Sequence, residues 1–175
     1  PDSIFLSRNS IRKYQKKEKS YKLVCDLLES VKWSPSAGNM QNWIFIIVQD
    51  KKKMARLASA CLNQNWICEA PIMIVVCYDE RNAKTLFQEK ATEFSVQNTA
   101  IASTYLILKA TELGLGSCWI DITNKDEVIS CLKLPPFVIP SHIITLGYQR
   151  GDYKKTSRND ISLSTYFEEY GKKKL

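Results

Sequence analysis

A helical pattern that runs from about Thr85 to Leu113 without a proline or a glycine constrains the fold more than any other segment. Its apolar side chains, which include Phe94, Ile101 and Tyr105, lie around the helix and not along a single stripe. A helix of this kind has more than one covered face. We therefore expect a central helix with the other elements packed around it.

Strands and shorter helices are predicted on both sides of that helix. Continuous apolar runs predict strands at 43–48, 72–77, 117–120 and 142–146. Apolar residues at helical spacing predict helices at 23–31, 51–61 and 125–132. No GxGxxG or GxxxxGK[ST] motif occurs in the loops, which disfavours Rossmann and P-loop folds. The order of elements indicates a mixed α/β protein.

The composition is that of one globular domain. The chain has 175 residues, of which 45% are hydrophobic and 25% are charged, so it can bury a core of its own. No apolar run approaches the length of a bilayer span, and the first residues carry no signal-peptide pattern. We therefore expect a cytoplasmic protein with no membrane partner.

The formal net charge is +7, and part of it comes from lysine runs at 16–17 and 172–174, which are typically solvated. A basic domain can bind nucleic acid, but this chain has no basic helix with interleaved aromatic residues. A nucleic-acid-binding module therefore depends on the charge alone, and we expect no nucleic-acid partner. An anionic small cofactor requires only three or four of these charges.

The cysteines do not indicate a disulfide framework or a metal site. The six cysteines are Cys25, Cys61, Cys68, Cys77, Cys118 and Cys131. None of them forms a CxxC pair, several lie in apolar segments, and His142 is the only histidine. We expect reduced, buried thiols and no bound metal.

A polar loop lies between the first predicted helix and the first predicted strand. Pro35 disfavours helical geometry at Ser34, and Gly38 can adopt a positive φ or approach a ligand closely. The serine hydroxyls and amide side chains around this glycine can then point toward a flat polar group. Alone, such a loop is more often a helix end with turn chemistry.

Arg8, Ser10 and Arg12 alternate near the start of the chain, so their side chains point the same way in an extended segment. Two guanidinium groups and a hydroxyl on one side suit a phosphate, because guanidinium donors match phosphate oxygens in pairs. A second basic cluster, at 154–158, could close this clamp if the chain folds back. Each cluster alone is also typical of a solvated surface.

The segment from Gly114 to Asp121 places two glycines at a helix end and then an aromatic residue and an acid. In structural terms this is a helix C-cap followed by a strand. In functional terms, a backbone amide just beyond the strand could meet a ring nitrogen of a planar cofactor.

The chain ends in a polar stretch, from Tyr148 to Asp160, followed by apolar residues such as Ile161 and Phe167. An apolar tail after a finished domain indicates an arm that packs on another molecule. A C-terminal helix that docks on its own subunit is the alternative, and the sequence does not decide between the two.

Five motifs together resemble the FMN-dependent nitroreductase family over nearly the whole chain. In order, they are SRNSIRKY, PSAGNMQNW, WICEAP leading into IMIVVC, ATELGLGSCWI, and ITLGYQ. The resemblance implies a single α+β domain over 1–175, with a mixed, mainly antiparallel sheet flanked by helices. It also implies an intertwined homodimer, in which an arm at about 150–175 is exchanged and two FMN molecules lie at the subunit interface.

The same resemblance assigns the cofactor site. The residues expected to bind FMN are Arg8, Asn9, Ser10, Arg12, Pro35, Ser36, Ala37, Asn39, Gln41, Asn63, Trp119, Ile120, Asp121, Lys155 and Arg158. Residues 8–12 would contact the phosphate and the pyrimidine edge, and the 35–41 loop would come from the partner subunit. The 119–121 segment would lie against the ring with a backbone N–H near N5, and the two basic residues of the arm would complete the phosphate site.

Two features depart from the family pattern. Trp66 stands where some members place a lysine close to the flavin, so a positive charge is missing or replaced. The segment 78–92 is short, without the extra helices that cover the active site in larger members.

The resemblance implies an NAD(P)H-dependent oxidoreductase that reduces nitroaromatics, quinones or similar small acceptors by ping-pong hydride transfer. The chemistry would take place on the flavin, with NADH or NADPH as donor and no catalytic side chain from the protein. Reductive dehalogenation or enoate reduction on the same scaffold is one alternative. A non-catalytic FMN carrier or sensor is another.

Overall fold

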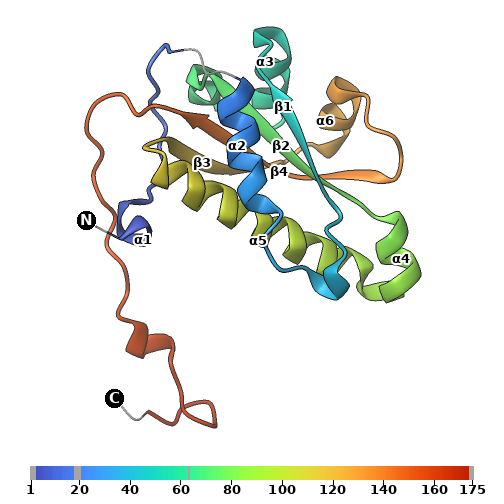
Figure 1. The fold of residues 1–175 in the computed structure, drawn as a ribbon, viewed down its shortest axis with the longest axis vertical. Coiled ribbons are helices and arrows are strands. Elements are labelled where there is room, and N and C mark those ends of the chain that lie inside the picture. The colour runs from blue at the N-terminus through green and yellow to red at the C-terminus, as the bar shows by residue number, and fades with distance from the viewer. Residues whose placement is uncertain (1–2, 18–20, 63, 174–175) are drawn as a thin grey trace.

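The computed structural model describes residues 3–17, 21–62 and 64–173 and shows a four-stranded sheet between two layers of helices (Figure 1). The sheet has the order β1-β2-β4-β3, and every neighbouring pair of strands is antiparallel. The strands are β1 (Trp43–Val48), β2 (Ile72–Asp79), β3 (Gly116–Asp121) and β4 (Val138–Gly147). The α-helices are α1 (Ile4–Ser7), α2 (Tyr21–Val31), α3 (Lys51–Ser59), α4 (Arg81–Phe87), α5 (Ala91–Glu112) and α6 (Lys125–Leu132). Short 3₁₀ turns are η1 (Ala37–Asn39), η2 (Asn65–Glu69), η3 (Gln88–Lys90) and η4 (Ile161–Ser164).

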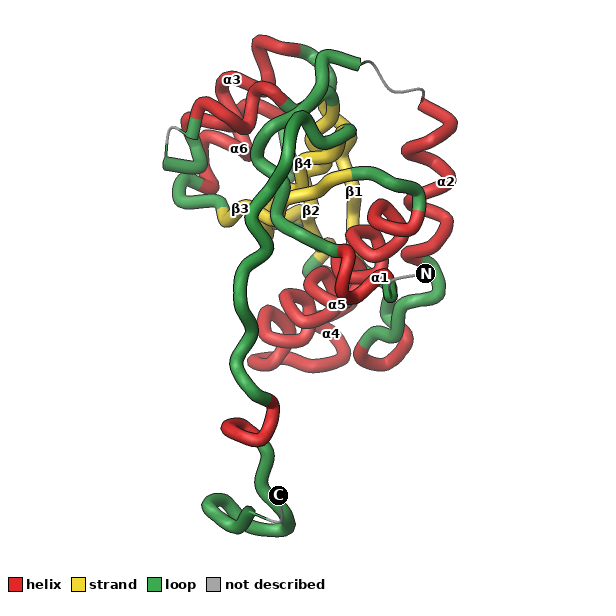
Figure 2. Tube along the Cα trace, turned by 90° about the vertical axis from the view of Figure 1, so that its left-hand side faces the viewer, coloured by secondary structure: helices red, strands yellow, loops and turns green. Residues whose placement is uncertain are grey.

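The two central strands are buried on both faces, which explains their continuous apolar runs. Ile74 and Ile144 belong to the core formed with α2 and α5. Their neighbours Val75 and Ile143 belong to the core formed with α3 and α6. Figure 2 shows the sheet between these two helix layers. The α+β class and the helix-flanked antiparallel sheet are therefore confirmed.

The central helix exists, but it begins at Ala91 and not near Thr85 as the pattern predicted. Gln88 adopts a positive φ of 46°, which ends α4 and turns the chain before α5. The two helices then meet edge to face through Phe87 and Phe94, with ring centroids 4.8 Å apart. Because no proline or glycine marks this break, the helical pattern concealed it.

Helix α5 is covered on more than one side, as its pattern indicated. Apolar residues such as Ala102 and Leu106 are buried in the core. The helix also buries polar residues, among them Ser95, Asn98 and Ser103. Every one of these polar side chains has a hydrogen-bond partner. The helix therefore supplies both core packing and a buried polar network.

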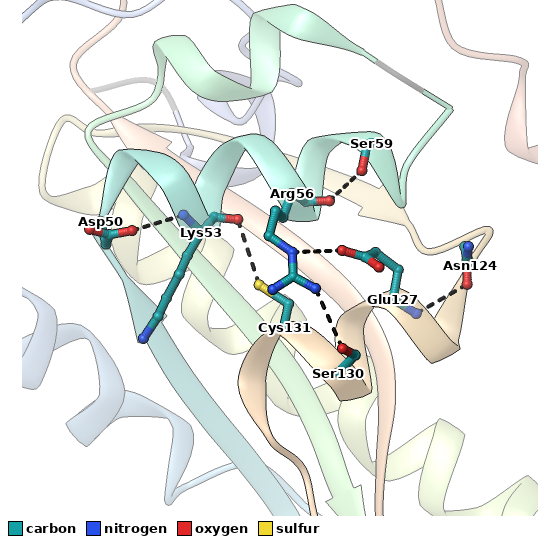
Figure 3. Close-up of polar contacts among 8 residues, drawn as sticks. All are labelled: Asp50, Lys53, Arg56, Ser59, Asn124, Glu127, Ser130 and Cys131. Carbon is teal, nitrogen blue, oxygen red and sulfur yellow. Dashed lines mark hydrogen bonds and ion pairs between the residues drawn. The ribbon is translucent and has the colours of Figure 1, made fainter.

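A hydrogen-bonded ion pair joins helices α3 and α6, which pack in the same core cluster (Figure 3). The Arg56 Nε donates to Glu127 Oε1 at 2.8 Å, and its Nη2 donates to Ser130 Oγ at 3.4 Å. Asn124 caps α6 by accepting a hydrogen bond from the Glu127 N–H at 3.1 Å. Because both charged side chains are partly exposed, this bridge contributes little to stability.

The C-terminal segment leaves the domain. Beyond Gly151 the described part of the chain contains only the short turn η4, and Figures 1 and 2 show this segment extending away from the sheet. Ile161 and Leu163 are 74% and 67% exposed. The alternative of a C-terminal helix docked on its own subunit is therefore not what the described residues form.

Two further properties concern the whole domain. All six cysteines are free thiols, and burial raises the pKa of Cys77 to about 12 and that of Cys61 to about 11. Among the helices of the described residues, none combines the length and apolarity needed to cross a bilayer.

Candidate functional site

The N-terminal segment lies along the open edge of β3. Ser10 forms a parallel bridge with Ser117, and the Ile11 N–H donates to the Ser117 carbonyl at 2.8 Å. The close approach requires Gly116, because a Cβ there would lie 2.8 Å from the Ile11 side chain. Further along, the buried Tyr14 hydroxyl bonds the Ile11 carbonyl at 2.6 Å. These contacts hold residues 10–14 extended.

Arg8, Ser10 and Arg12 each act on the Cys118 thiol, Ser10 through a side-chain hydrogen bond and the two arginines through their charge. Burial raises the pKa of Cys118, while Arg12, a hydrogen bond from Ser10, and Arg8 lower it in part. Within the described residues, neither arginine forms an ion pair with a carboxylate. Three side chains of this segment therefore influence one thiol, and no carboxylate of the described residues neutralises either guanidinium group.

The edge of β3 offers backbone donors beside these side chains. Because the Ser117 carbonyl points outward to Ile11, the N–H groups of Trp119 and Asp121 also point outward by the alternation of a strand. The Trp119 indole Nε1 donates to Asp121 Oδ1 at 3.1 Å. An open edge with free N–H groups is a natural place for a polar ring to bind.

Trp119 is backed by a buried histidine. The ring centroids of Trp119 and His142 are 3.6 Å apart, and His142 is 2% exposed. The imidazole bonds Ser103 Oγ through Nε2 at 2.7 Å and Ser141 Oγ through Nδ1 at 3.0 Å. Burial lowers the pKa of His142 to about 3, so the ring is neutral near pH 7. The sequence pattern did not assign His142 a role, although a histidine within an apolar strand run was the available signal.

The polar loop at 35–41 is fixed to the N-terminal half of α5. Its backbone has positive φ at Gly38 (57°), Asn39 (54°) and Gln41 (48°). The Ala37 N–H donates to Asn98 Oδ1 at 2.8 Å. Asn98 in turn donates to the Asn42 side chain at 2.9 Å. The loop is therefore held in one conformation by a buried amide network.

Within one chain, this loop and the 8–12 segment lie at opposite ends of α5. The loop is bonded to Asn98, whereas Ser10 pairs with Ser117, which follows the C-terminal end of the helix. From Asn98 to Glu112, α5 extends about 20 Å at 1.5 Å per residue. The structure of one chain thus does not bring together the two groups of predicted residues.

The remaining predicted residues have different surroundings. Asn9 donates from its amide to the Ser7 carbonyl at 3.0 Å. Ile120 is 4% exposed in the core shared with α3 and α6, on the sheet face opposite Trp119. Lys155 and Arg158 are exposed on the C-terminal arm, where Arg158 Nη1 bonds Thr156 Oγ1 at 2.6 Å. The prediction for Asn63 falls outside the described residues.

A contact that the sequence did not predict joins Arg12 to Trp66 in η2. The guanidinium carbon of Arg12 lies 5.7 Å from the centroid of the Trp66 ring. The indole Nε1 of Trp66 donates to Gln64 Oε1 at 3.1 Å. Trp66, which stands where some family members have a lysine, is therefore uncharged but contacts the positive charge of Arg12.

A cavity of about 850 Å³ opens near this region without including the predicted residues. Its lining consists of Gln15, Lys16, Lys17, Gln49, Lys51, Asn65, Cys68, Glu69 and Pro71. Lys51 is already engaged, since its Nζ donates to the Cys68 and Ala70 carbonyls at 3.4 and 3.3 Å. Among the predicted residues that the structure describes, none lines this cavity.

Comparison with known proteins agrees with this architecture. The sequence model of the Nitroreductase family matches residues 6–67 and 58–148. A Methanothermobacter thermautotrophicus protein, provisionally named NADH dehydrogenase/NAD(P)H nitroreductase, is 32% identical over 146 residues, covering 81% of this chain and 73% of that protein. A Bacillus subtilis protein named FMN reductase (NAD(P)H) is 27% identical over 154 residues, which cover 79% of this chain and 61% of that protein. The solved structure of an FMN-dependent nitroreductase from Clostridium difficile R20291 has a TM-score of 0.80 and 27% identity, and covers 96% of this chain and 99% of that one.

Proposed function

This chain belongs to the nitroreductase family, and from that premise we propose that the surface along β3 binds FMN for the reduction of small electron acceptors. The protein is a flavin oxidoreductase that uses FMN, with NADH or NADPH as electron donor. Its acceptors are nitroaromatics, quinones or similar small molecules. FMN, when bound, supplies the redox chemistry by taking a hydride from the nicotinamide and passing electrons on.

One observation carries this proposal: the segment with Arg8, Ser10 and Arg12 pairs with the open edge of β3, and no carboxylate of the described residues forms an ion pair with either arginine. FMN combines a phosphate with a flat ring that has a polar edge. Guanidinium groups match the phosphate and the electron-rich carbonyl edge, and outward N–H groups match ring acceptors. The donor set of this surface therefore fits FMN.

We propose the following roles for the residues of this surface. Arg8 and Ser10 bind the phosphate, and Arg12 places its positive charge at the pyrimidine edge, where it stabilises negative charge on the reduced ring. The backbone N–H groups of Trp119 and Asp121 face the ring from the strand edge. The buried side chain of Ile120 anchors that edge to the core.

The site is completed by a second copy of the chain. We infer a homodimer because the 35–41 loop and the 8–12 segment of one chain are too far apart to contact the same FMN. The loop is bonded to Asn98 of α5, about 20 Å from the end of the helix near Ser10. The loop residues concerned are Pro35, Ser36, Ala37, Asn39 and Gln41. The loop of one subunit then lines the FMN held by the 8–12 segment of the other.

The C-terminal arm is the second element of the proposed dimer. Residues from about 150 to 173 extend from the body, and the exposed Ile161 and Leu163 have no core in their own chain. Packing of this arm on the partner covers those side chains. The arm also carries Lys155 and Arg158 to the phosphate site of the partner. Separately, Asn63 remains a proposed contact to the polar edge of the flavin ring.

The test is an absorption spectrum of the purified protein, reconstituted with FMN, before and after NADH or NADPH is added without oxygen. The proposal expects flavin bands that bleach, and bands that return when a nitroaromatic or a quinone is added. Bands that persist with NAD(P)H but bleach with a chemical reductant would indicate a carrier or sensor. A protein that binds no FMN would refute the proposed site.

A further inference from the structure

The contact between Arg12 and Trp66 has the geometry of a cation–π interaction. The guanidinium carbon lies 5.7 Å from the centroid of the indole ring, within the about 6 Å over which a ring face attracts a cation. Among the described carboxylates, none pairs with Arg12. The indole is therefore the group that holds this guanidinium.

Trp66 is itself held from several sides. Its Nε1 donates to Gln64 Oε1 at 3.1 Å, which fixes the orientation of the ring. The ring packs against the buried cluster of Ile11, Tyr14 and Ala70. It is thus a rigid surface beside the segment that carries Arg12.

The backbone around the pair is also cross-linked. Arg150 donates from Nη2 to Glu69 Oε2 at 2.8 Å, and Glu69 is the last residue of η2. The Arg150 N–H donates to the Lys13 carbonyl at 3.0 Å, next to Arg12 in the chain. These two bonds connect η2 to the N-terminal segment, so the separation of Arg12 and Trp66 does not depend on their side chains alone.

We propose that Trp66 is a positioning residue that aims the Arg12 guanidinium at the pyrimidine edge of bound FMN. This inference rests on the function proposed above. It assigns to an uncharged residue the electrostatic tuning of the cofactor, because Trp66 acts only through the charge that it holds.

The choice of an indole has a physical reason. A carboxylate partner would hold the guanidinium but would also neutralise its charge and occupy its donors. A ring face attracts the cation and leaves the N–H donors, which lie in the guanidinium plane, free for an oxygen acceptor. Trp66 can therefore orient Arg12 while the full positive charge remains available to the ligand.

The test is a double-mutant cycle on the full chain, with Trp66→Leu and Trp66→Phe made in the wild type and in Arg12→Gln. Two quantities are measured: the FMN dissociation constant, by fluorescence titration, and the midpoint potential of bound FMN. Trp66→Leu is expected to weaken FMN binding about two- to fivefold. If it weakens binding of reduced FMN about fivefold more than binding of oxidised FMN, the potential falls by about 20 mV for a two-electron couple.

The cycle distinguishes positioning from a purely structural role. In the Arg12→Gln background, Trp66→Leu is expected to change neither quantity, because there is no charge left to aim. Trp66→Phe keeps a ring face and is expected to have a smaller effect in the wild type and none in Arg12→Gln. If circular dichroism shows that the Trp66→Leu variant does not fold, Trp66→Phe takes its place in the double-mutant cycle.

A matched control is Trp33→Leu, which makes the same substitution at a side chain that is 76% exposed on the loop after α2. It is expected to leave the potential unchanged. Equal effects of Trp66→Leu in both backgrounds, or no effect in the wild type, would overturn the role of Trp66. A wild-type protein without FMN would instead refute the proposed function, and this inference with it.

Discussion

The indole ring of Trp119 lies almost parallel to the imidazole ring of His142, with the centroids 3.6 Å apart and the planes 13° apart. Trp119 faces the open edge of the sheet, whereas His142 is buried under it and bonded to two serines. The pair links the proposed cofactor surface to the polar network of α5. A change in the charge of His142 is therefore expected to affect both the stability of the domain and the Trp119 ring that stacks on it.

We expect the free energy of unfolding to fall as the pH decreases from 6.5. Burial lowers the pKa of His142 from 6.5 to about 3, so in this window the unfolded chain binds a proton that the folded chain excludes. Stability from this group is fully present above pH 6.5 and is lost progressively toward pH 3. The expected loss is about 2 kcal/mol between pH 6.5 and about pH 4.5.

Urea denaturation at a series of pH values measures this loss. The control is His142→Gln, which is expected to be less stable at pH 7 but to show a flatter pH dependence. The same slope in both proteins would mean that another group is responsible. The carboxyl of Asp79 contributes little between pH 6.5 and 4.5, because its ordinary pKa of 3.8 lies below that range and the hydrogen bond from the Arg81 side chain lowers its pKa further in the folded chain.

Asn98→Ala is expected to loosen the 35–41 loop and to destabilise the domain. The substitution leaves the Ala37 N–H and the side-chain Oδ1 of Asn42 without their buried partner. Each unsatisfied buried group costs about 1–3 kcal/mol, so a total loss of about 2–4 kcal/mol is expected. If a second copy uses this loop to line its FMN, cofactor affinity falls as well.

The measurements are urea denaturation and FMN titration of the same variant. Gln97→Ala is the matched control, because Gln97 is the neighbouring residue of α5 and its exposed amide bonds only Glu93. It is expected to change stability by less than about 0.5 kcal/mol. If Asn98→Ala unfolds like the control, the buried network does not hold the loop.

A chain that ends at Arg150 is expected to form monomers and to lose FMN. The removed segment is exposed in one copy and makes few contacts with its own domain, so the truncated domain is expected to fold. Light scattering after gel filtration gives the mass, and absorption gives the FMN content. A truncated protein that stays dimeric with bound FMN would contradict arm exchange.

The sequence predicted best where one local pattern determined the structure. The apolar run at 43–48 became β1 with the predicted bounds, and the alternation of Arg8, Ser10 and Arg12 agrees with their shared influence on the Cys118 thiol. The break at Gln88 was missed, because its positive φ occurs without a glycine or proline to mark it. The pairs Trp119–His142 and Arg12–Trp66 were also missed, since residues far apart in sequence meet only through the register of β3 with β4 and the placement of η2.

Substitution of Arg8 separates phosphate binding from ring binding. If Arg8 binds the phosphate, Arg8→Gln removes charge-assisted hydrogen bonds worth about 1.5–3 kcal/mol, which corresponds to a ten- to hundredfold weaker affinity for FMN. Riboflavin has the same ring without the phosphate, so its affinity is expected to be unchanged. Arg12→Gln is the matched comparison, because a guanidinium at the pyrimidine edge contributes to the binding of both ligands, and both affinities then fall together.

Fluorescence titration of the two variants with FMN and with riboflavin measures all four changes in affinity. Equal losses of FMN and riboflavin in Arg8→Gln would contradict the phosphate role and place that charge at the ring instead.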